Sequence, residues 1–344
     1  MNLFYIISSI KITKDLLLLK VFIVLNRGEI IVTTKNINYE PVLNWAKLPM
    51  GISFYGDCAA VATDSKDNVY VFNRGTDPIC VFDESGNFIR SFGKGDFDGA
   101  HGIAIDEDDN IFLVDTGGHF VQKRDNDGKV IFTIGERGKP SAWQEGDMFN
   151  RPTDIIIHPK TGELFISDGY GNSRVHKLSP DGKHIKSWGV PGTDNGEFSL
   201  PHSISMIGDD KVIVADRENF RLQIFSTEGE YLDQWHLHHP MSVIQGKNGD
   251  NNLYIGEMGP PFVQTDVPDL GNRIVILSPT GERITQFGNG LPGQNPDQFV
   301  APHGVGTDSK GNVYVAEVAW TWWGSKRVPQ PLGELISLRK WKRK

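Results

Sequence analysis

Ile111-Phe112-Leu113-Val114-Asp115 is a short apolar run that closes on an acid, and the chain contains six such runs, each of which closes on an acid or an amide. The other five are Val69–Asn73, Leu164–Asp168, Val212–Asp216, Leu253–Glu257 and Val313–Glu317. Short runs rich in β-branched and aromatic residues predict strands. The closing residues of successive runs lie 41 to 60 residues apart, which predicts one supersecondary unit repeated six times.

Each run has further predicted strands around it. An apolar, alternating stretch precedes it, a third stretch such as Arg174–Leu178 follows it, and a fourth ends in an aromatic-glycine pair such as Trp188-Gly189. Four strands in each of six units predict an all-β, six-bladed β-propeller over residues 39–344.

The last unit lacks a fourth strand of its own. Residues 334–341 can supply its third strand, and residues 41–45 resemble a fourth strand that precedes the first full unit. We therefore expect the ring to be closed by an N-terminal strand in the last blade, which removes the exposed edges of an open sheet. Residues 1–38 are expected to form an extension outside the propeller.

Composition limits the partners. The 344 residues include 35 basic and 43 acidic ones, a net charge of −8, which argues against nucleic acid because phosphates require a basic face. The apolar run at residues 16–25 is interrupted by Lys20 and is too short to span a bilayer, so no stable membrane insertion is expected. Cys58 and Cys80 are either free or joined in one bridge. Cellular compartment and oligomeric state stay open.

Three histidines occupy one position in alternate units. His101, His202 and His303 each lie 14 residues before their unit's closing acid, and each lies 101 residues from the next. Equivalent positions on innermost strands face the central channel, and alternate blades are about 120° apart. The imidazoles therefore predict an axial metal site with an open position for water or substrate, as in catalytic zinc sites. Iron or another transition metal is also compatible with imidazole ligands.

A lone histidine at a strand start would be interpreted as a turn residue, and the shared position of three favours the metal site. The other histidines show no such register. We expect His236, His238 and His239 to lie in a solvated loop. His119, His158, His176 and His184 are expected at the surface.

Three more side chains follow closing residues at the same mouth of the channel: Arg74, Tyr170 and Arg217. Two arginines beside a metal predict a small substrate with a carboxylate, which a planar guanidinium binds bidentately. A tyrosine near a metal and two arginines is placed to act as a base. Taken singly, each could instead be a blade-edge ion pair or a stacked ring.

The unit pattern resembles NHL repeats over roughly residues 40–341. A more specific resemblance is to the peptidyl-α-hydroxyglycine α-amidating lyase family. It is carried by Asn73-Arg74-Gly75, Ser167-Asp168-Gly169-Tyr170, Pro201-His202-Ser203, Asp216-Arg217-Glu218-Asn219 and Pro302-His303.

The resemblance implies an axial zinc held by the three histidines, Tyr170 as the catalytic tyrosine, and Arg74 and Arg217 as the active-site arginines. The implied reaction is cleavage of an N-substituted α-hydroxyglycine to an amide and glyoxylate.

The sequence departs from the family at three points. Gly304 stands where the family has an aspartate that helps to hold a structural calcium, so calcium is doubtful here. Gly171 replaces a cysteine of a disulfide. No copper monooxygenase domain is recognised, so a small N-acyl or N-alkyl hydroxyglycine is an alternative substrate to a peptide precursor.

Two other functions stay open. One is another metal-dependent propeller enzyme, such as a hydrolase or lactonase, which predicts a carboxylate-rich calcium site. The other is a non-catalytic NHL interaction module, which predicts no bound metal.

Overall fold

The computed structural model describes residues 22–26, 29–33, 37–259, 270–327 and 329–344. The chain divides into two compact units, residues 1–38 and residues 39–344. In the first unit, β1 (Phe22–Asn26) pairs antiparallel with β2 (Glu29–Thr33). Most of the apolar run at residues 16–25 lies outside the described residues. None of the described helices is long and apolar enough to cross a membrane.

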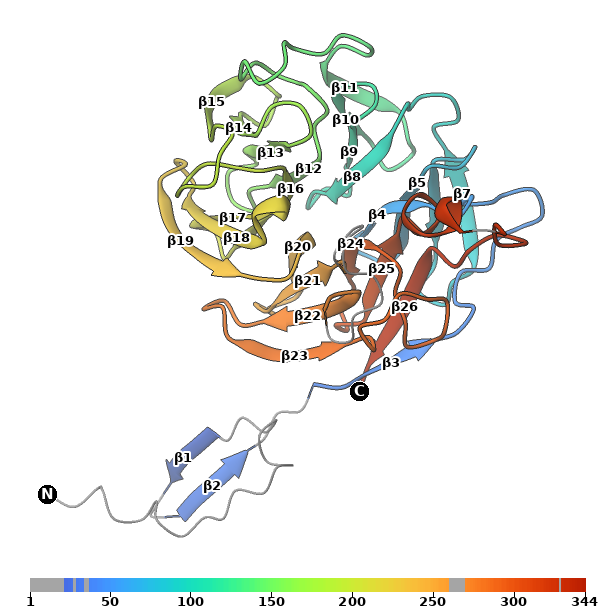
Figure 1. Cartoon of the computed structure of the whole chain (residues 1–344), viewed down its shortest axis with the longest axis vertical. Coiled ribbons are helices and arrows are strands. Elements are labelled where there is room, and N and C mark those ends of the chain that lie inside the picture. The colour runs from blue at the N-terminus through green and yellow to red at the C-terminus, as the bar shows by residue number, and fades with distance from the viewer. Residues whose placement is uncertain (1–21, 27–28, 34–36, 260–269, 328) are drawn as a thin grey trace, which may run out of the picture. The chain divides into compact units, whose positions relative to one another are not determined.

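The second unit is the predicted six-bladed β-propeller, with six four-stranded antiparallel sheets arranged around one axis (Figure 1). Each blade is given from its innermost to its outermost strand. The blades are β4 (Cys58–Thr63), β5 (Val69–Asn73), β6 (Ile79–Phe82) and β7 (Phe88–Phe92); β8 (Ala100–Ile105), β9 (Ile111–Asp115), β10 (Phe120–Arg124) and β11 (Val130–Gly135); β12 (Asp154–Ile157), β13 (Leu164–Asp168), β14 (Arg174–Leu178) and β15 (His184–Trp188); β16 (Pro201–Ile207), β17 (Lys211–Asp216), β18 (Arg221–Ser226) and β19 (Tyr231–His236); β20 (Pro240–Gln245), β21 (Leu253–Glu257), β22 (Arg273–Leu277) and β23 (Arg283–Phe287); and β24 (Pro302–Thr307), β25 (Val313–Glu317), β26 (Leu338–Arg343) and β3 (Tyr39–Val42).

The ring closes as the sequence predicts. β3 pairs antiparallel with β26, from Tyr39 opposite Arg343 to Val42 opposite Lys340, and so becomes the outermost strand of blade six. This strand is slightly shorter and earlier than the expected 41–45, and β26 starts later than 334. Residues before Leu338 are bonded elsewhere: the Ile336 N–H donates to Gln294 Oε1 at 2.6 Å, and the Phe54 N–H donates to Glu334 Oε1 at 2.7 Å.

The second strand of each blade is buried on both faces because neighbouring blades cover it. All five residues of β5, β9, β13, β21 and β25 are buried. This explains why these runs read as continuous apolar segments and not as alternating ones. Outermost strands such as β15 and β19 keep exposed positions.

The closing acids hold the entrance to each inner strand. Asp115, Asp216 and Glu317 are fully buried. Their carboxylates accept backbone N–H bonds from Asp98 at 2.6 Å, Ser199 at 2.7 Å and Val300 at 2.5 Å. Each bond fixes the loop that leads into the inner strand of the same blade, three residues before the histidine that faces the axis.

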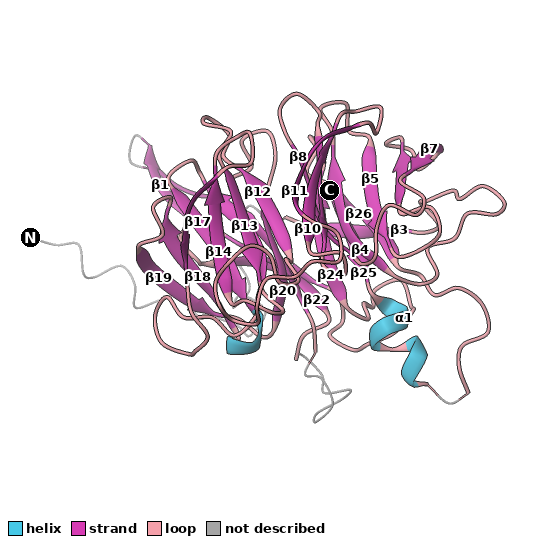
Figure 2. Ribbon diagram, turned by 90° about the horizontal axis from the view of Figure 1, so that it is seen from above, coloured by secondary structure: helices cyan, strands magenta, loops and turns pink. Residues whose placement is uncertain are grey.

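Helical structure among the described residues is confined to three short segments. They are η3 (Arg217–Asn219) after β17, then α1 (Ala319–Trp322) and η4 (Gly324–Lys326) in the connection between β25 and β26. Figure 2 shows α1 at one face of the ring, beyond the ends of the strands.

Candidate metal centre and active site

A β-bulge on the inner strands selects the residue that faces the axis. In blade four, Pro201 pairs with Asp216 and Ser203 with Ala215, so His202 is the extra residue between them. The same shift leaves out His303 in blade six and Met241 in blade five. A bulge re-aims its extra side chain, and here it turns that side chain to the channel.

The structure brings the three predicted histidines together. The ring centroids of His101, His202 and His303 lie 4.5 to 4.7 Å apart, and one ligand atom from each lies within 4.8 Å of the others. All three side chains are buried. They are the only group of three or more His, Cys, Asp or Glu that the described residues bring within ligating distance.

Each ring is oriented by a backbone carbonyl from the next blade. Nδ1 of His101, His202 and His303 lies 2.6, 2.5 and 2.7 Å from a carbonyl oxygen. Because a carbonyl can only accept, Nδ1 carries the proton and Nε2 keeps its lone pair. The carbonyls belong to Thr153, Met241 and Ala59, which stand at the histidine position in the three alternate blades.

The electrostatics keep the imidazoles neutral. Burial is the main cause that lowers the pKa of His101 and His202 well below the usual range. Burial also lowers the pKa of His303 to about 3, with a further contribution from Arg74. Neutral rings with a free Nε2 are the form that binds a metal, so the cluster can hold a metal ion.

Tyr170 lies beside the histidine cluster. Its hydroxyl is 3.1 Å from Nε2 of His101 and 3.2 Å from Nε2 of His202. A group that occupied the cluster would therefore have a phenolic oxygen next to it. Tyr170 follows β13 within a turn whose Gly169 packs so tightly that a Cβ there would meet the Pro201 carbonyl oxygen at 2.2 Å.

The two predicted arginines face the same mouth. Arg217 is buried, its guanidinium carbon lies 5.7 Å from the Tyr170 ring centroid, and its Nε donates to Glu218 at 2.8 Å. The Nε of Arg74 donates to the Ala100 carbonyl at 3.4 Å, and its Nη1 lies 3.9 Å from Asp57. Nη1 of Arg74 also donates to Thr321 Oγ1 at 3.4 Å, and Nη1 of Arg217 to Met241 Sδ at 3.8 Å. Within the described part of the chain, Nη2 of each guanidinium remains for a carboxylate.

Several expectations about the remaining histidines are wrong. His239 is fully buried, stacks on Phe220 at 5.1 Å, and has its Nε2 3.4 Å from Glu218. It lies two residues before Met241, at the start of an inner strand, which the strand register would have indicated. His158 and His176 are also buried, and His176 bonds to Ser187 and Asp168.

The structure explains why position 304 holds no carboxylate ligand for calcium. A Cβ on Gly304 would meet the Ala59 carbonyl oxygen and the Ala60 Cα at 2.7 Å, so this backbone has no room for an aspartate there. Asp154 occupies the equivalent position in blade three, but its oxygens accept from the backbone of Ile155 and from Ser203, at 2.9 and 2.7 Å. Calcium requires six to eight oxygen ligands.

Burial raises the pKa of Asp154 to about 6, against the effect of these hydrogen bonds. Cys58 and Cys80, the two cysteines of the chain, are both buried and free. Of the two alternatives left open by the sequence, the structure therefore has free thiols and no disulfide.

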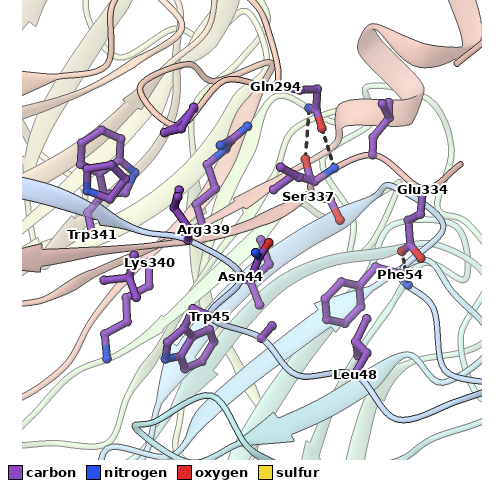
Figure 3. Close-up of a pocket in the computed structure, with 18 residues that line it drawn as sticks. Asn44, Trp45, Leu48, Phe54, Gln294, Glu334, Ser337, Arg339, Lys340 and Trp341 are labelled. Atoms are coloured by element: carbon purple, nitrogen blue, oxygen red, sulfur yellow. Dashed lines mark hydrogen bonds between the residues drawn. The ribbon is translucent and has the colours of Figure 1, made fainter.

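A cavity of about 220 Å³ lies away from the histidine cluster, where β3 joins β26 (Figure 3). Trp45, Leu48, Phe54 and Trp341 supply much of its wall. Glu334 is bonded to the backbone of Phe54, as the close-up shows. None of the residues predicted for the site lines this cavity, so the channel mouth is the candidate site.

Fold and site together define a class, the NHL-repeat propeller with a histidine cluster on its axis. An NHL-repeat family model matches residues 198–225. Among solved structures, a streptogramin B lyase has the same fold, with a TM-score of 0.57 and 13% identity over 90% of this chain and 98% of that one.

Curated relatives narrow the class. NHL repeat-containing protein 3 from Homo sapiens is 31% identical over 88% of this chain and 87% of its own length. Peptidyl-α-hydroxyglycine α-amidating lyase 1 from Drosophila melanogaster is 30% identical over 68% of this chain and 45% of its length. Peptidylglycine α-amidating monooxygenase from Rattus norvegicus is 31% identical over 76% of this chain.

The chain spans only 29% of the length of that monooxygenase. The chain belongs to the NHL-repeat propeller family that contains these amidating lyases and NHL repeat-containing protein 3.

Proposed function

We propose that the protein is a metal-dependent carbon-nitrogen lyase that cleaves an N-substituted α-hydroxyglycine to an amide and glyoxylate. The observation that carries the proposal is the Tyr170 hydroxyl, which lies within 3.2 Å of Nε2 on both His101 and His202. The name of the fly relative supports the same reaction class.

His101, His202 and His303 would hold the metal, most simply zinc, through their three Nε2 atoms. When bound, such a metal supplies Lewis-acid polarisation of a substrate oxygen. The three rings need no further rearrangement of protons, because their Nδ1 atoms already donate to backbone carbonyls.

Tyr170 acts as the base in this proposal. Its phenolic oxygen takes the proton of the substrate hydroxyl, the O–H electron pair forms the aldehyde carbonyl, and the C–N bond breaks. The departing nitrogen keeps the bond pair and takes that proton from the Tyr170 hydroxyl to give the amide, so the tyrosine returns to its starting form. Arg74 and Arg217 bind the carboxylate that becomes part of glyoxylate and stabilise charge that develops there.

The test is turnover of α-hydroxyhippurate by zinc-loaded protein, with glyoxylate and benzamide measured together. Tyr170→Phe keeps the ring but removes the base, so kcat should fall on the order of a hundredfold to ten-thousandfold, with metal content unchanged. A Tyr170→Phe rate within about threefold of wild type would exclude the tyrosine as base.

One observation favours a second candidate, a non-catalytic interaction module. The relative that this chain matches over most of both lengths, NHL repeat-containing protein 3, has a name that specifies no reaction. Fully metallated protein that turns over none of a panel of small N-acyl α-hydroxyglycines would favour this candidate, or a hydrolase, over the lyase.

A further inference from the structure

Arg151 lies at the mouth of the channel, two residues before Thr153, which stands at the histidine position of blade three. Arg151-Pro152-Thr153 occupies in blade three the place of Leu200-Pro201-His202 in blade four. The carbonyl of Thr153 is the group that accepts the Nδ1 proton of His101. Arg151 is therefore two residues from a direct support of the histidine cluster.

The backbone of Arg151 is held so that its side chain covers Tyr170. Its φ of 62° is uncommon for a residue other than glycine. Two contacts hold this conformation: the Arg151 N–H donates to His119 Nδ1 at 3.0 Å, and the Tyr170 N–H donates to the Arg151 carbonyl at 3.4 Å. The guanidinium carbon lies 4.9 Å from the Tyr170 ring centroid.

The charges at the mouth do not balance. Arg217 is paired with Glu218 and Arg74 lies beside Asp57. Arg151 is exposed, and no carboxylate in the described part of the chain pairs with it. One substrate carboxylate can be bound by Arg74 and Arg217, so Arg151 is a surplus cation within reach of a molecule seated over Tyr170.

We propose that Arg151 forms a second anion subsite, which recognises an acidic group on the amide portion of the substrate. The inference rests on the proposed lyase function and names its substrate class: α-hydroxyglycines whose N-acyl group carries a carboxylate. The planar guanidinium binds such a group through two parallel N–H bonds, which a neutral amide in the same place cannot match.

The experiment compares N-succinyl-α-hydroxyglycine with N-succinamoyl-α-hydroxyglycine, which has nearly the same shape but a neutral end. Wild type should show a kcat/KM at least about tenfold higher for the succinyl compound, as expected for a charge-assisted hydrogen bond. Arg151→Met should bring the two values within about twofold, and this ratio is the readout because a loss through Tyr170 would lower both values equally. Arg283→Met, at an exposed arginine on outer strand β23, is the matched control and should keep the preference.

Other outcomes overturn the subsite. Equal values for the two compounds in wild type do so, and so does an equal loss for both in Arg151→Met, because Arg151 would then act only through Tyr170 or on the shared carboxylate.

Binding of N-succinylglycine and N-succinamoylglycine, which lack the α-hydroxyl and so cannot undergo C–N cleavage, separates failure of the subsite from failure of the lyase. Preferential binding of the succinyl analogue, lost in Arg151→Met, would support the subsite even without turnover. No preference in binding or turnover would overturn the subsite alone if glyoxylate is still released.

Discussion

At the scale of single residues, the axial site depends on backbone atoms as much as on side chains. Each histidine ring is oriented by a carbonyl from Thr153, Met241 or Ala59, residues with no common side-chain chemistry. The register of the repeats was enough to predict the three histidines, because spacing alone places them at one level. The carbonyl partners could not be predicted, since they depend on how the backbone of the intervening blades lies beside the axis.

The first prediction concerns metal content. About one equivalent of a transition metal should copurify, and alanine at His101, His202 or His303 should remove most of it because each supplies one of three protein ligands. His184→Ala, at an exposed histidine on the outer strand of blade three, is the control and should leave the metal in place. Elemental analysis of purified protein measures this. Full metal in all three axial variants would contradict the site.

The second prediction concerns pH and Asp154, whose pKa burial raises to about 6 from an ordinary value of 3.8. A raised pKa in the folded state stabilises the protein below pH 3.8, and this contribution is lost as pH rises through 6. Asp154→Asn does not titrate. The unfolding free energy of wild type relative to Asp154→Asn should therefore fall by about 2–3 kcal/mol between pH 4 and pH 7, in metal-free protein.

Chemical denaturation of both proteins at several pH values measures this difference, in which contributions from the histidines cancel. Parallel pH profiles for the two proteins would show that Asp154 is not a buried acid of raised pKa.

At the scale of elements, the short helix α1 is the part that the repeat pattern did not predict. It lies in an insertion between β25 and β26, and an insertion belongs to one blade, so comparison of the units gives no information about it. Its position depends on a distant residue: Asp57 accepts N–H bonds from Trp320 at 2.9 Å and Thr321 at 3.1 Å. The strands themselves were predicted well, because every blade repeats their pattern.

The third prediction follows from this anchor. Asp57→Ala removes the acceptor of the Thr321 amide and hydroxyl and one of two acceptors of the Trp320 amide, which keeps the Gly56 carbonyl. It also removes the carboxylate beside Arg74. The protein should lose about 1–3 kcal/mol of stability to urea, and iodide should quench tryptophan fluorescence more strongly, since α1 carries Trp320 and Trp322. Ser325→Ala, which removes one exposed bond to the same segment, should change stability by less than about 0.5 kcal/mol. Equal stability of the two variants would contradict the anchoring role.

At the scale of the whole molecule, the protein has a net negative charge but a positively charged channel mouth. The protein carries a net charge of −8, yet Arg74, Arg151 and Arg217 gather at the channel mouth. An anionic substrate is therefore repelled by the molecule in general and attracted at one place, which favours selective binding there.

The closure of the ring was predictable because four-stranded blades leave one strand missing at the end of the sequence and one spare strand near its beginning.

Closure also links the histidine cluster to the chain's early residues. His303 stands on β24, the innermost strand of blade six, whose outermost strand is β3. Trp341 of β26 is buried and packs against Phe287 of β23 and Phe299 of the loop before β24, so blade six is held against blade five.

The last prediction compares two truncations, one that starts at Asn38 and keeps β3, and one that starts at Asn44 and removes it. The shorter protein exposes the unpaired edge of β26, loses the four pairs from Tyr39 to Val42, and loosens the blade that carries His303. Its Tm should fall by at least about 5 °C, it should aggregate at lower concentration, and it should bind less metal. The protein that starts at Asn38 should match the full chain in Tm, aggregation and metal content, because residues 1–38 form a separate compact unit. Calorimetry, light scattering and elemental analysis measure these properties, and equal Tm values for the two truncations would show that β3 does not hold the ring closed.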